Sequence, residues 1–180
     1  MTKIVNDGSD FPVFSAASAD NVAPDAAAIA GDDASATRVA VGSSVDWEAL
    51  VAAAVTIMAK AYAPYSKFKV GVAGLMDDGR FVVRCNVENA SYGIGLCAEC
   101  GMVSNIHATG GGTLLAIACV DQHGDALMPC GRCRQLLWEH GRPGSLIRTP
   151  EGILTLADIL PQAFGPQDLI DRAEDRTHRD

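Results

Sequence analysis

The residues best suited to chemistry are four cysteines arranged in two C-x-x-C pairs. Cys97 and Cys100 enclose Glu99, and the second pair, Cys130 and Cys133, directly follows a proline. This spacing favours metal binding over disulfide formation. Cysteine thiolates bind zinc tightly, and three protein ligands leave a position open for catalysis, whereas four close the site.

Two interpretations of these cysteines stay open on spacing alone. If all four coordinate zinc, the protein is a zinc-stabilised binding module without catalytic activity. If Cys97, Cys130 and Cys133 are the ligands, Glu99 beside the open position can carry protons. A redox dithiol is disfavoured, because neither pair has a thioredoxin-like sequence context. The place of Glu99 inside the first pair favours the enzyme.

Both pairs stand where helices are predicted to begin. One helix runs from Cys97 to the glycines 110–112, and the other runs from Cys130 through Glu139 to Gly141. The free N–H groups and positive dipole at a helix N-terminus stabilise thiolates, so we expect lowered thiol pKa values here.

The rest of the ordered chain supplies a scaffold for these helices. Apolar periodicity predicts a helix over 50–61, strands over 67–76, 81–87, 114–120 and 145–149, and a short helix over 156–160. The first strand alternates, so we expect it to be half-buried, whereas LLAIACV over 114–120 is typical of a fully buried strand. A hairpin turn over 77–80 joins the first two strands. This order predicts a three-layer α/β domain around a mixed sheet.

Three further residues fall in apolar patterns without an evident chemical role. Cys85 and Cys119 lie in the predicted strands, and His107 lies on the apolar face of a predicted helix. We interpret all three as packing residues of the core.

Charge and composition exclude several classes of protein. The formal net charge is -8, which disfavours binding to long nucleic acid. Half of that charge lies in residues 1–43, where six Asp face only Lys3 and Arg38. No apolar run approaches the roughly 18 residues that span a bilayer, and the N-terminus lacks the pattern of a secretory signal. We expect a cytoplasmic protein that binds neither membranes nor nucleic acid.

Three segments resemble the small, homotetrameric zinc-dependent cytidine deaminases: FKVGVA, CNVENASYGIGLCAE and PCGRCRQLL. The likeness runs from about Tyr62 to Phe164. C-A-E followed by a distant P-C-x-x-C is typical of zinc nucleoside and base deaminases, and N-V-E-N narrows the match to nucleosides. The resemblance implies a three-layer α/β/α fold around a mixed five-stranded sheet, one Zn²⁺ per subunit, and a homotetramer.

The domain organisation follows from this likeness and from composition. Residues 1–43, rich in Ala, Asp and Ser, are predicted to be a disordered extension. Residues 44–166 are the expected cytidine deaminase-like catalytic domain, and residues 167–180 are a charged C-terminal tail.

The resemblance also implies roles for individual residues. Cys97, Cys130 and Cys133 match the zinc ligands, and Glu99 matches the proton carrier that serves hydroxide attack at C4 of cytosine. Six more positions match substrate contacts: Asn86 and Glu88 for the ribose 3′-hydroxyl, Phe68 as an aromatic wall, the backbone at Ala98 for the base edge, Tyr92 in the pocket, and Phe164 reaching a neighbouring subunit's pocket. A solvated strand end for the polar pair and core packing for the aromatics stay open as alternatives.

Cys100 departs from the family, many members of which carry Arg there. An arginine beside three zinc-bound thiolates offsets their negative charge. We expect Arg134 or Arg132 to take over this compensation.

The expected function is hydrolytic deamination of free cytidine and deoxycytidine to uridine and deoxyuridine, in pyrimidine salvage. The alternatives are a deaminase of a cytosine-containing nucleoside antibiotic, whose second motif can also read PCGRCRQ, and the non-catalytic four-thiolate zinc module. Nucleic-acid editing is disfavoured, because the chain lacks a basic or aromatic-rich groove.

Overall fold

The computed structural model of the protein describes residues 45–170. The helices are α2 (Trp47–Met58), the 3-10 helix η2 (Tyr92–Ile94), α3 (Ala98–Ala108), α4 (Gly131–His140) and α5 (Leu156–Ile159). The strands are β1 (Gly71–Met76), β2 (Phe81–Cys85), β3 (Leu114–Val120), β4 (Leu146–Thr149) and β5 (Gly152–Thr155). Residues 166–170 are also helical. The predicted extension over 1–43 and residues 171–180 of the predicted tail lie outside the described residues.

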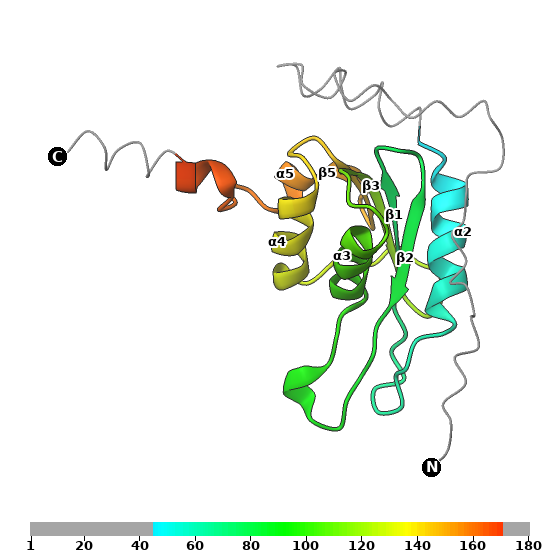
Figure 1. The fold of residues 1–180 in the computed structure, drawn as a ribbon. Helices are drawn as coiled ribbons and strands as arrows, with labels where there is room; N and C mark the ends of the chain where they lie inside the picture. The colour runs from blue at the N-terminus through cyan, green and yellow to red at the C-terminus, as the bar shows by residue number, and fades with distance from the viewer. Residues whose placement is uncertain (1–44, 171–180) are drawn as a thin grey trace, which may run out of the picture.

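The five strands form one sheet in the order β2-β1-β3-β4-β5. Only β3 and β4 run parallel; the other neighbours are antiparallel. Helix α2 covers one face, and α3, α4 and α5 cover the other (Figure 1). The three-layer α/β/α fold around a mixed five-stranded sheet is therefore confirmed.

The edge strand β5 is the element that the apolar pattern missed. Its four residues are mostly exposed or half-buried, so they leave no alternation to detect. Gly152 opens the strand with a φ of 117°, which closes a tight turn after β4.

Strand β1 is buried on both faces, so the prediction of a half-buried strand is wrong. The strand begins at Gly71 because Val70 donates its N–H to the Asn86 side chain (2.8 Å). A Cβ at Gly71 would lie 2.1 Å from the Ala54 carbonyl oxygen on α2, and one at Gly74 would lie 2.5 Å from Leu114 Cδ1. Gly71 therefore lets α2 approach the strand closely, and Gly74 leaves room for Leu114 of β3 and for Met102 of α3, whose Sδ would lie 3.0 Å from that Cβ.

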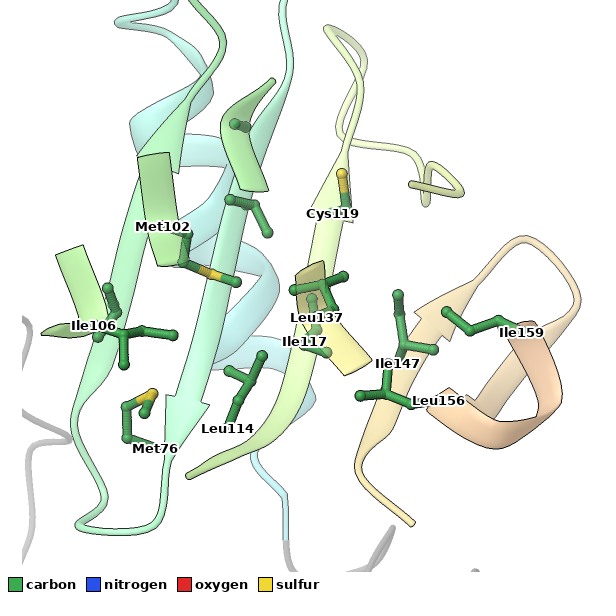
Figure 2. Close-up of a cluster of buried hydrophobic side chains, with 13 residues drawn as sticks. Met76, Met102, Ile106, Leu114, Ile117, Cys119, Leu137, Ile147, Leu156 and Ile159 are labelled. Carbon is green, nitrogen blue, oxygen red and sulfur yellow. The ribbon is translucent and has the colours of Figure 1, made fainter. Parts of the chain in front are cut away.

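The central strand β3 is buried along its whole length, as predicted. Its side chains alternate between two core clusters, so each face of the sheet receives different residues. Ile117 and Cys119 belong to the cluster under α3, α4 and α5, which is drawn in Figure 2. Ala116 and Ala118 belong to the cluster under α2.

Two helices begin at the C-x-x-C pairs, as predicted. Cys97 is the N-cap residue of α3, and Cys130 is the N-cap residue of α4. On the opposite face, Asp46 caps α2 by accepting a hydrogen bond from the Ala49 N–H (2.9 Å).

Within residues 45–170, every helix is too short or too polar to cross a membrane.

Candidate metal centre and active site

Three cysteine sulfurs meet between the starts of α3 and α4. The Sγ atoms of Cys97, Cys100 and Cys133 all lie within 4.8 Å of one another. Three sulfurs held by one tetrahedral zinc at about 2.3 Å would be roughly 3.8 Å apart. The donor set and its spacing therefore fit a zinc ion.

Cys130 lies at the exposed edge of this cluster. The pKa of its thiol is lowered, first by the backbone N–H of Cys133 and then by the side chains of Cys133 and Cys97. Its sulfur therefore neighbours two of the three clustered sulfurs. The three sulfurs that lie within 4.8 Å of one another include Cys100 and leave out Cys130. The ligand set of Cys97, Cys130 and Cys133 stays a prediction.

The two more buried thiols do not follow the expected helix effect. Burial is the largest cause that raises the pKa of Cys97, and it also raises the pKa of Cys133, where the Glu99 carboxylate adds to it. The prediction of lowered pKa values holds for Cys130 and is wrong for Cys97 and Cys133 without metal. A coordinated metal removes this penalty, because metal-bound thiols are deprotonated.

Glu99 is a buried carboxylate beside the sulfur cluster. It lies in the first turn of α3 and is 4% exposed. Cys119 donates a hydrogen bond from Sγ to Glu99 Oε1 at 3.5 Å. The predicted burial of Cys119 is confirmed. Its hydrogen bond to Glu99 was not predicted, because the surrounding strand sequence is apolar and indicates only packing.

A cavity of about 360 Å³ opens next to Glu99. This volume lies in the range of pockets that bind small molecules. Seven predicted site residues line it together: Phe68, Asn86, Glu88, Cys97, Ala98, Glu99 and Cys130. Leu127 and Met128 add apolar wall from the loop before Pro129, and nothing in their sequence context indicated this role.

Asn86 fastens the segment that carries Phe68. Its side-chain oxygen accepts the Val70 N–H (2.8 Å), and its side-chain nitrogen donates to the Phe68 carbonyl (3.0 Å). The side chain is therefore held by the fold and is not simply solvated, and its role as a sugar ligand stays a prediction. One amide hydrogen is left for a ligand in the cavity.

Glu88 is held by the turn that precedes Phe68. Oε2 accepts the backbone N–H groups of Tyr65 (2.9 Å) and Ser66 (3.3 Å), and Oε1 accepts the Ser66 hydroxyl. The Ser66 hydrogen bond is the largest cause that lowers the pKa of this carboxyl, so Glu88 is ionised near neutral pH. Sequence reasoning missed both turn residues, because they lie 22 and 23 residues before Glu88 and only the fold brings them into contact with it.

Tyr92 and Phe164 do not line this cavity. Tyr92 is 88% exposed and lies on a neighbouring cavity of about 390 Å³, which shares Glu88 with the first. Phe164 is 54% exposed, and its carbonyl accepts a hydrogen bond from the Gln135 side chain (2.8 Å). Within a single chain, neither aromatic ring closes the site.

The two candidate arginines differ in position. Arg134 is half-buried, and its Nη1 donates to the Ile159 carbonyl (2.9 Å). Its Nη2 lies 3.8 Å from the point where a Cβ on Gly131 would stand, next to Cys130. Arg132 is exposed. Arg134 is therefore the better candidate of the two. Its Nε is buried and has no hydrogen-bond partner among the described residues.

His107 is exposed, so its interpretation as a core residue is wrong. Its Nε2 lies 3.3 Å from His140 Nδ1, and the two rings meet edge to face. The apolar stripe of α3 ends at Ile106, one residue earlier.

The fold and the cysteine cluster define a zinc-binding α/β protein with a small-molecule cavity beside the metal centre. Residues 44–146 match the model of the "Cytidine and deoxycytidylate deaminase zinc-binding region". The chain therefore belongs to the cytidine deaminase family and is an enzyme of that class.

Individual relatives agree with this assignment. A cytidine deaminase of Mycobacterium tuberculosis is 59% identical over 125 residues, which cover 69% of this chain and 94% of the relative. One from Halalkalibacterium halodurans is 36% identical, covering 71% of this chain and all of the relative (100%). The crystal structure of the Mycobacterium leprae cytidine deaminase superposes with a TM-score of 0.65 at 61% identity, covering 66% of this chain and 99% of that one.

Proposed function

We propose that the protein hydrolyses free cytidine and deoxycytidine to uridine and deoxyuridine, releasing ammonia, in pyrimidine salvage. One observation carries the proposal: a buried carboxylate, Glu99, shares a cavity wall with cysteines of a zinc-type cluster and with the polar pair Asn86 and Glu88. The names of the relatives support cytidine as the substrate.

Cys97, Cys130 and Cys133 would hold one zinc ion per chain, with Cys100 beside them. When bound, zinc supplies a hydroxide nucleophile near neutral pH. Arg134, through its Nη2 above Gly131, is our candidate for offsetting the thiolate charge. If so, replacing Arg134 and Arg132 together lowers zinc affinity.

Glu99 would carry the protons of the reaction. Its carboxylate takes the proton of the attacking water and delivers it to N3 of the pyrimidine, as hydroxyl adds at C4. The same carboxylate would then take the proton of the new C4 hydroxyl and give it to the C4 amino group. The C4–N bond breaks, ammonia leaves, and C4 keeps the carbonyl oxygen of uridine. Its burial keeps bulk water away from these transfers.

Asn86 and Glu88 would bind the sugar with the capacity that the loop leaves them. Asn86 keeps one amide hydrogen to donate. Glu88 uses three of about four acceptor positions, so one on Oε1 can accept a sugar hydroxyl. The Phe68 ring, 42% exposed at the cavity, would pack on the nucleoside.

A homotetramer would complete the pocket. Large apolar side chains near Glu88 and Cys97 in the chain or across a bridge to Val87 are exposed in the single chain: Tyr62, Tyr92, Ile94 and Leu96 are each more than half exposed, from 51% to 88%. Such a patch is typical of a protein interface. Phe164 of a neighbouring chain would then reach the site. A cytoplasmic location stays a prediction.

A four-thiolate zinc module is the second candidate, because the Cys100 sulfur lies in the same cluster as those of Cys97 and Cys133. If Cys100 closed the coordination sphere, the protein would bind zinc tightly but turn over no nucleoside.

An ultraviolet assay of cytidine and deoxycytidine tests the proposal. We expect turnover by the zinc-loaded protein and a loss of about 10⁴-fold in Glu99→Gln, because the proton carrier is gone. Glu48→Gln, an exposed glutamate on α2, is the matched control and keeps its activity. Absence of turnover by zinc-replete protein would contradict the proposal and favour the module or a different nucleoside.

A further inference from the structure

Glu99 receives its one side-chain hydrogen bond from the sheet beneath it. Cys119 Sγ lies 3.5 Å from Glu99 Oε1, and both side chains are buried. Within residues 45–170, the carboxylate accepts no other side-chain hydrogen bond. A thiol is a weak donor, but here it faces an anion, which strengthens the bond.

Cys119 occupies a fixed place in the fold. It pairs with Val72 of β1 across the ladder and is fully buried (0% exposed). In Figure 2 it lies at one end of the core cluster on β3, beyond Ile117. Burial raises the pKa of its thiol well above the usual value, and the Glu99 charge raises it further, so the sulfur keeps its proton. Cys119 therefore acts as a donor and not as a nucleophile.

We propose that Cys119 is a positioning residue, which holds Glu99 Oε1 against the sheet and leaves Oε2 to face the cavity. The catalytic meaning of this contact rests on the proposed function. A carboxylate on a short helix turn can rotate about its side-chain bonds, and one fixed oxygen removes that freedom. An apolar residue at this position would leave Oε1 buried without a partner.

Two substitutions, both smaller than cysteine, test the hydrogen bond. Cys119→Ala removes the atom at the sulfur position together with the donor, whereas Cys119→Ser puts a smaller atom there that keeps a donor. We expect Cys119→Ala to lower kcat for cytidine about tenfold with KM within about twofold, since the contact serves the transition state. Cys119→Ser should keep kcat within about threefold of the wild type. Both variants should keep their zinc content.

Equal losses of kcat in the two variants would show a packing effect and overturn the proposal. Unchanged kcat in Cys119→Ala would overturn it as well. A rise in KM alone would place Cys119 with substrate binding and not with Glu99.

A second readout does not depend on turnover. The infrared S–H stretching band of Cys119 is identified by its loss in Cys119→Ser. We expect this band to move to the frequency of a free thiol in Glu99→Ala, and a band that stays in place would overturn the contact. If the wild type failed to deaminate cytidine while the band moved, the proposed function would fail and the Cys119–Glu99 contact would stand.

Discussion

The two faces of the sheet differ in what their helices do. On one face, α2 packs along the sheet with small residues, Ala53 and Ala54, against Ala116 and Ala118 of β3. On the other face, α3 and α4 point their N-termini at a common place and bring cysteines there. Strand β3 thus packs alanines against α2 on one face, and on the other face its Cys119 donates a hydrogen bond to Glu99.

The difference separates two demands on the sequence. The α2 face needs close approach, so its substitutions should change stability and leave catalysis alone. The α3–α4 face needs particular thiol and carboxylate groups at fixed places. Its substitutions should change catalysis or metal binding and lower the free energy of unfolding less. Variants on the two faces test this division.

The largest effect is expected at the metal cluster. Cys130→Ser should remove bound zinc and lower the cytidine rate by at least about 10³-fold, because the serine hydroxyl is a poor zinc ligand. Cys100→Ser, which makes the same change at the paired cysteine outside the proposed ligand set, should keep zinc and activity. Metal analysis after gel filtration, together with the rate, measures both. Loss of zinc in Cys100→Ser would support the four-thiolate site instead.

The α2 face should respond through stability alone. A methyl group at Gly71 would lie 2.1 Å from the Ala54 carbonyl oxygen and 2.6 Å from Met58 Cβ. We expect Gly71→Ala to lower the free energy of unfolding by about 2–3 kcal/mol, measured by urea denaturation. Gly93→Ala, where a Cβ meets nothing within 4 Å, is the control and should change little. The kcat of folded Gly71→Ala should match the wild type; a loss of kcat would break the division between the faces.

A smaller effect is expected where the loop holds Glu88. Ser66→Ala removes the hydroxyl that bonds Oε1, so we expect KM for cytidine to rise about fivefold with kcat nearly constant. Ser104→Ala, exposed on α3, is the matched control. An unchanged KM would mean that the backbone N–H groups alone hold Glu88.

The smallest effect concerns the histidine pair, which lies on the chemical face but away from the cavity. Burial, and then His107, lower the pKa of His140 below its ordinary value of 6.5. The unfolded chain therefore binds more protons near that pH, and stability falls as the pH drops through about 6.5. We expect His140→Gln to reduce the fall in melting temperature between pH 8 and pH 5.5 by about 2 °C. His107→Gln removes the effect of His107 on His140 but leaves His140 buried, so it should give an intermediate value. The same fall in all three proteins would contradict the assignment.

Sequence patterns predicted α2, α3, α4 and the central strand β3 because each is long and has a buried face. The helix starts at Cys97 and Cys130 and the burial of β3 followed directly from residue type and spacing. Strand β5 escaped, since four mostly exposed residues carry no periodicity. The prediction that β1 is half-buried failed because glycine carries no apolar side chain to indicate burial. Nothing in the sequence therefore indicated that α2 packs closely on Gly71.

The active-site residues were predictable from motifs, but their contacts were not. Motif positions placed Glu99, Asn86 and Glu88 at one cavity. The partners that hold them, Ser66 and Cys119, lie 22 and 20 residues away along the chain. Only the fold brings such partners together, so no local pattern could reveal them.

The most direct test of the central claim is the cytidine rate during zinc titration of the metal-free protein. The account predicts no activity without zinc, a linear rise in rate, and a break at one zinc per chain. Zinc bound at one per chain without turnover would contradict it and leave a closed four-thiolate site as the explanation.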